Sequence, residues 1–108
     1  DTTMDKIAAT DWTIIGDAIV AYTGWGTTPY PKPDERRVIA DFGRDMAQRL
    51  LPIVLKCYKD FFASNANFRA VDLEEMERMA SEDFVRDNPL MPRTAVIAMA
   101  WCYTFAHK

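Results

Sequence analysis

The hydrophobic pattern of this chain centres on one uncharged run near its C-terminal end, residues 94–106. Apolar residues would lie on every side of a helix formed by this run, and such a helix must sit inside a protein or a membrane. The run is shorter than the roughly 20 apolar residues that a membrane span needs. Trp101, Tyr103 and Phe105 would supply most of its buried area, and the alanines between them would allow close helix packing. We therefore predict the central helix of a helical domain.

An amphipathic helix is predicted between residues 10 and 23. Its apolar positions recur at helical spacing on one face, and they are Trp12, Ile15, Ile19 and Tyr22. Thr10 or Asp11 would form the N-cap, and Gly24 would end the helix. Gly16 lies inside the stripe, where it either weakens the helix or lets another backbone come close.

Residues 23–33 are predicted to form a loop, because three prolines and two glycines exclude both a helix and a central strand. The loop is unusual in holding two large aromatic residues, Trp25 and Tyr30. Two interpretations stay open. Both rings fold back over the helices as a lid, or both are presented to a partner.

A long helical segment is predicted from Asp34, which would act as N-cap, to the polar residues Ser64, Asn65 and Asn67. Its first half has an apolar stripe of helical period, formed by Ile39, Phe42, Met46 and Leu50. Pro52 removes a backbone donor and disfavours helical geometry at the preceding residue. We expect one helix kinked near Pro52, or two helices that meet there.

The next helix has the clearest start signal of the chain. Asp72 and Glu75 have the spacing of a capping box, and Val71 and Met76 are placed for a hydrophobic staple. The inward-facing stripe is predicted to be Leu73, Met76, Ala80 and Phe84. An Asn-Pro pair at residues 88–89 would end this helix before the central one begins.

These patterns predict an all-α fold: a single domain, residues 1–108, with about five helices packed irregularly around a buried C-terminal helix. The length suits one domain, and 49% apolar residues is ordinary for a globular protein. No alternating pattern in the sequence indicates a sheet.

Residues suited to catalysis or metal binding are few. The single histidine, His107, is next to last, and Cys57 and Cys102 lie 45 positions apart among apolar residues. No zinc-binding or nucleophile motif joins them, so we predict no enzyme activity, no metal and no cofactor. Both cysteines are expected to be buried thiols, and a bridge between them is the alternative if the protein is exported.

The strongest signal for function is a concentration of acidic residues. Residues 72–87 hold seven acids and two arginines, a net charge of −5, so the other residues carry +2 of the chain's total of −3. A solvated helix whose first-turn acids complement its own dipole explains Glu74 and Glu75. It does not explain Glu82, Asp83 and Asp87. A concentrated negative surface favours rapid capture of a basic protein. The predicted partner-binding residues are Asp72, Glu74, Glu75, Glu77, Glu82, Asp83 and Asp87, with Trp25 and Tyr30 from the loop.

The leading hypothesis is therefore a non-enzymatic domain that binds a basic protein. Small bacterial proteins of this size, charge and helicity include immunity proteins and antitoxins. The analogy rests on these overall properties and not on a sequence motif. One alternative is a helical subunit of a larger assembly, phage-type or homo-oligomeric. Another is a small ligand-binding bundle with a pocket lined by Trp12, Trp101, Tyr103 and the methionines.

We do not expect nucleic acid or a membrane as partner. The basic residues between Arg36 and Lys59 are interspersed with acids, whereas nucleic-acid binding needs an uncompensated positive surface. No apolar run is long enough to span a bilayer. We expect a cytoplasmic protein, and the periplasm or secretion is the alternative if a leader preceded Asp1.

Overall fold

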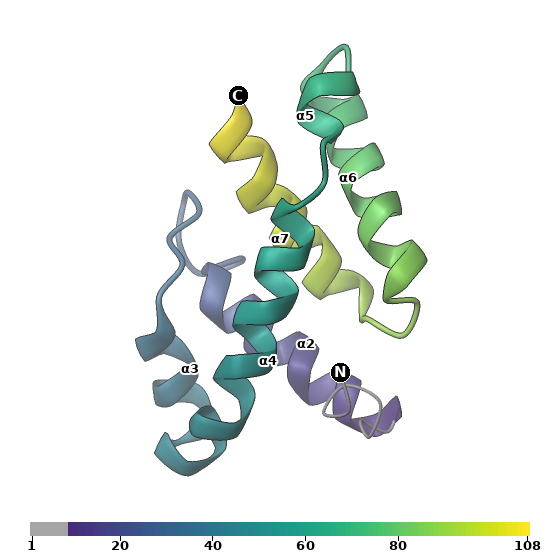
Figure 1. Ribbon diagram of the computed structural model, residues 1–108. Helices are drawn as coiled ribbons and strands as arrows, with labels where there is room; N and C mark the ends of the chain where they lie inside the picture. The colour runs from purple at the N-terminus through teal and green to yellow at the C-terminus, as the bar shows by residue number, and fades with distance from the viewer. Residues whose placement is uncertain (1–8) are drawn as a thin grey trace.

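The computed structural model describes residues 9–108, which form helices and no strand (Figure 1). The all-α prediction is confirmed. Five of the helices have eight or more residues, and a sixth, α5, is a single turn. Their bounds are α2 Ala9–Thr23, α3 Glu35–Phe42, α4 Arg44–Phe62, α5 Ala66–Arg69, α6 Leu73–Asp87 and α7 Arg93–His107.

Helix α7 occupies the centre of the molecule, as its apolar sequence predicts. It packs against α2, α4 and α6, and Ala98, Met99, Ala100 and Tyr103 have no exposed surface. The prediction is wrong for Phe105, whose side chain is 43% exposed. This residue lies in the last turn of α7, where the Nζ atom of Lys108 is 4.4 Å from the centroid of its ring.

Helix α2 ends as predicted, because Gly24 adopts a positive φ of 87°. Its start is earlier than predicted: α2 already includes Ala9, so Thr10 and Asp11 lie inside the helix and neither is its N-cap. Gly16 allows another segment to come close, as one of the two predictions had it, but the neighbour is the Pro92 side chain and not a backbone. A Cβ atom at this position would lie 2.7 Å from Cγ of Pro92, at the entrance to α7.

The long segment after Asp34 breaks at Gly43 and not at Pro52. Gly43 has φ 82° and ψ 159°, a conformation that is essentially restricted to glycine. Its N–H donates to the Ile39 carbonyl at the end of α3, and its carbonyl accepts from the Ala47 N–H at the start of α4. The alternative of two helices that meet at Pro52 is thus wrong, since α4 runs through this residue.

A proline inside α4 leaves the carbonyl of Gln48, four residues earlier, without its helical N–H donor. Pro52 and Gln48 are both exposed, so water can solvate this carbonyl.

Helix α6 begins as predicted, with the Asp72 side chain accepting a hydrogen bond from the Glu75 N–H at 2.8 Å. The predicted hydrophobic staple is wrong, because Val71 is 83% exposed and does not pack on the buried Met76. Leu73, predicted to face inward, is 45% exposed. The inward-facing stripe of α6 consists of Met76, Ala80 and Phe84.

Candidate functional site

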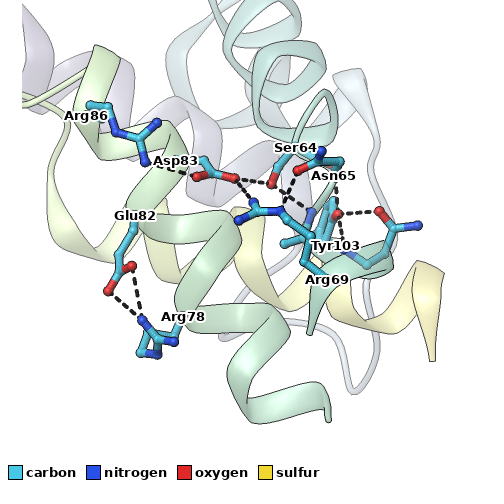
Figure 2. Close-up of polar contacts among 10 residues, drawn as sticks. Ser64, Asn65, Arg69, Arg78, Glu82, Asp83, Arg86 and Tyr103 are labelled. Carbon is cyan, nitrogen blue, oxygen red and sulfur yellow. Dashed lines mark hydrogen bonds and ion pairs between the residues drawn. The ribbon is translucent and has the colours of Figure 1, made fainter. Parts of the chain in front are cut away.

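Two of the predicted partner-binding acids, Glu82 and Asp83, form ion pairs within the domain (Figure 2). Glu82 pairs with Arg78 one turn earlier, at 2.9 Å. Asp83 binds two guanidinium groups, that of Arg69 at 2.7 Å and that of Arg86 at 3.1 Å. Three arginines therefore compensate these two carboxylates. As a result, the second half of α6 contributes little uncompensated negative charge.

The other five predicted acids form no ion pair among residues 9–108, and they are Asp72, Glu74, Glu75, Glu77 and Asp87. Four of them lie within the six residues 72–77, where Glu75 is half-buried and the other three are exposed. The uncompensated negative charge of α6 is thus concentrated in its first half. We call residues 72, 74, 75 and 77 the acidic end of α6.

A polar network ties α5 to the body of the domain and was not predicted from the sequence (Figure 2). Asp83 accepts from the Ser64 hydroxyl at 2.6 Å, and Arg69 donates to the Asn65 side chain at 2.7 Å. Together these residues line an open groove of about 990 Å³ between α4, α5 and α6. The bonds that Asp83 forms with Ser64 and Arg69 hold α5 in place. Asp83 is therefore a structural residue of the domain.

Tyr103 of α7 holds α5 from the other side. Its hydroxyl lies 2.7 Å from the carbonyl oxygen of Ser64 and 2.8 Å from Oδ1 of Asn67, and it accepts from the Asn67 N–H at 3.1 Å. The Tyr103 side chain is fully buried, so these bonds form away from water.

The network predicts an acid-dependent stability. Hydrogen bonds from Ser64 and Arg86 and the positive charge of Arg69 lower the pKa of Asp83 below its usual value near 3.8. Because this pKa is lower in the folded state, the stabilisation is present above pH 4 and is lost as the pH falls through the folded-state pKa. Asp83→Asn should cost about 1–2 kcal/mol at pH 7.

Urea unfolding at pH 7 and pH 3 checks this prediction. The difference in stability between the natural chain and Asp83→Asn should shrink at the lower pH. The carboxyl of Asp34, whose pKa is lowered to about 2 by its bonds to Arg36, is present in both proteins and cancels in the comparison. An equal difference at both pH values would contradict the role given to Asp83.

A second groove, of about 780 Å³, runs between α6 and α7 beside the acidic end. Its apolar lining comes from Val85, Met91, Val96 and Ile97. Its charged lining is balanced, with three carboxylates and three arginines: Glu74, Glu77, Glu82, Arg78, Arg86 and Arg93. Arg78 is bound to Glu82, and Arg86 is bound to Asp83. Glu74 and Glu77 are therefore the acids of this groove that form no ion pair in the described chain.

The loop of residues 23–33, which carries two aromatic rings, does not lie beside the acidic end of α6 (Figure 1). Trp25 packs edge-to-face on Trp101, with ring centroids 5.2 Å apart, and Tyr30 stacks at 6.5 Å on Phe105. Both rings thus contact α7, and the segment between α2 and α3 that carries them lies on the side of α7 away from α6 (Figure 1). Trp25 is half-buried, as a lid would be, whereas Tyr30 keeps 53% of its surface exposed.

The two thiols are buried in the core, whereas His107 is exposed at the end of α7. Cys57 and Cys102 are buried free thiols, and burial raises the pKa of each to about 11, so both are protonated at neutral pH. The His107 ring lies 4.5 Å from that of Tyr103, centroid to centroid. Between residues 9 and 108, no three of the possible metal-binding side chains form a cluster, and no helix could span a membrane.

The interpretation as a ligand-binding bundle expects a pocket lined by three aromatic residues, Trp12, Trp101 and Tyr103, together with methionines. In the structure Trp12 and Tyr103 belong to the packed core, and neither groove described above is lined by these three residues.

Sequence analysis also missed two exposed apolar side chains next to the acidic end, Phe68 and Val71, which are 85% and 83% exposed. A usable signal was present, because Phe68 belongs to no apolar stripe and stands between polar residues that end one helix and begin another.

Comparisons with protein-family models, with curated proteins and with solved structures gave no match for this chain.

Proposed function

We propose that this chain is a non-catalytic protein-binding domain that engages a basic protein through the acidic end of α6. An inhibitor of a basic toxin, of the immunity or antitoxin kind, is the class that the size, charge and helical content favour. The observation that supports the proposal is the concentration, within residues 72–77, of four carboxylates that form no ion pair with any residue from 9 to 108.

The charges of the acidic end act on the approach of the partner. Exposed charges of one sign attract an oppositely charged protein and raise its association rate, and salt screens the effect. Glu82 and Asp83 contribute less to this attraction, since arginines of the domain already compensate them. The groove between α6 and α7 places apolar surface beside Glu74 and Glu77, and burial of that surface would favour a long-lived complex.

The experiment compares two charge reversals of equal size. Glu74→Lys with Glu77→Lys alters the acidic end, whereas Glu35→Lys with Asp41→Lys alters exposed acids of α3. Each pair reverses one first-turn acid and one acid further along its helix, and each shifts the net charge by the same amount. Affinity capture from cells of the source organism identifies proteins that depend on the acidic end, and association rates are then measured with the purified partner.

At low salt the α6 pair should slow association by roughly tenfold or more and weaken its salt dependence, while the α3 pair should have a much smaller effect. Circular dichroism checks that both variants remain folded. If no basic protein depends on Glu74 and Glu77, or if both pairs slow association equally, the acidic end is not the binding site.

A further inference from the structure

Among the residues that the structure describes, the two most exposed large apolar side chains lie close together, at the corner that joins α5 to α6. Phe68 is 85% exposed, Val71 83% and Leu73 45%, within six consecutive residues. We call residues 68–73 the apolar corner. It stands at one extremity of the molecule, where α5 and the start of α6 project beyond α4 (Figure 1). Adjoining apolar side chains exposed to this degree are typical of an interaction surface.

The apolar corner is held in a fixed conformation. Ala66 is fully buried beneath it, and the Phe68 and Ala70 N–H groups donate to the carbonyls of Asn65 and Ala66. The ion pair from Arg69 to Asp83 and the bonds of the Tyr103 hydroxyl fix the same segment to α6 and α7 (Figure 2). A surface held in this way loses little conformational entropy when it binds.

The charges around the apolar corner restrict what can cover it. The acidic end begins inside the corner, at Asp72, and continues along α6. The one cation of residues 68–77, Arg69, is bound to Asp83. A second copy of the chain placed across a twofold axis would set these carboxylates against their equivalents. An anionic lipid surface would repel them as well. A protein surface rich in lysine and arginine would be attracted.

We infer that Phe68 and Val71 are the apolar anchor of the partner-binding surface, and that the partner presents an apolar pocket bordered by lysine or arginine. This inference rests on the proposed function and locates its principal contact. Exposed aromatic side chains that become fully buried supply most of the affinity in many interfaces, whereas charges at the rim chiefly affect the association rate. The apolar corner therefore contributes more to the lifetime of the complex than the groove between α6 and α7 does, and the acidic end determines how quickly the complex forms.

The test has two stages and uses the full chain. First, a photo-crosslinking benzoyl-phenylalanine replaces Phe68 in cells of the source organism, and the same group replaces Leu55, an exposed apolar residue of α4, as control. The expected product, found only at position 68, joins the chain to a basic protein. A product with a second copy, a lipid adduct at this position, or no product overturns the inference.

Second, dissociation constants for the crosslinked protein are measured with the natural chain, with Phe68→Ser plus Val71→Ser, and with Glu74→Lys plus Glu77→Lys. The serine pair should weaken binding about tenfold or more through faster dissociation and leave the salt dependence unchanged. Its melting temperature should equal that of the natural chain, because both side chains are exposed. Unchanged binding by the serine pair, with slow association of the lysine pair, would overturn the apolar anchor and leave the proposed function standing. Unchanged binding by both pairs would overturn both proposals.

Discussion

Ala100→Asp is expected to unfold the domain. Ala100 has no exposed surface and lies in the middle of α7, the helix against which α2, α4 and α6 pack. A carboxylate at this position would lie in the core without a basic partner, which costs several kcal/mol, and its extra volume would add strain. Domains of this size are stable by only about 5–15 kcal/mol. We expect loss of the cooperative thermal transition followed by circular dichroism, with a large decrease in helical signal.

Ala106→Asp provides the matched control, since it makes the same chemical change in the same helix. Ala106 is exposed in the last turn of α7, where a negative charge opposes the helix dipole and costs about 0.3–1 kcal/mol. This variant should fold with a slightly lower melting temperature. If Ala100→Asp melted at the same temperature as Ala106→Asp, α7 would not be the dry centre of the domain.

The elements that sequence predicted well are those determined by local chemistry. An uncharged run such as residues 94–106 is most stable as a helix in the interior of a domain, and most of α7 lies there. The side chains of Asp34 and Asp72 accept backbone N–H bonds at the starts of α3 and α6, because a cap needs only residues two or three positions away. Gly24 ends α2 for the same local reason.

The position of the break between α3 and α4 was not predictable in this way. Gly43 and Pro52 are both helix breakers by local rules, and tertiary structure determines which of them acts. Pro52 falls on the exposed side of α4, where the carbonyl that loses its helical donor is accessible to solvent. Gly43 falls where the chain must turn for Val38 and Ala47 both to reach the core.

The candidate site also combines contacts that local sequence predicts with contacts that only the tertiary structure creates. The pairing of Arg78 with Glu82 follows from a spacing of four residues and could have been predicted. Asp83 is different, because its partners Ser64 and Arg69 are 19 and 14 residues away in sequence and lie beside it only after folding. Counting charges along residues 72–87 therefore located the acidic helix but could not separate structural carboxylates from available ones.

Tyr103→Ala is expected to produce the second large loss of stability, about 3–5 kcal/mol, because it leaves a cavity where a fully buried ring packs against Phe61 and Phe62. Tyr103→Phe isolates the hydroxyl group. It keeps the ring and removes the hydrogen bonds to Ser64 and Asn67, at a cost of about 1–3 kcal/mol. Chemical denaturation measures both losses.

Tyr30→Phe controls for the loss of a hydroxyl, since the Tyr30 side chain is 53% exposed and the variant should be as stable as the natural chain.

The location of the amides that lose protection from exchange distinguishes a local effect of Tyr103→Phe from a general weakening of the fold. Amide exchange should accelerate most at Asn67, whose N–H loses its acceptor, and in α5 around it. Because the apolar corner is then less firmly held, Tyr103→Phe should also weaken partner binding, although the Tyr103 side chain is fully buried in the domain. Uniform acceleration of exchange across α2, α4 and α7, with unchanged binding, would show that the hydroxyl stabilises the fold without fixing the corner.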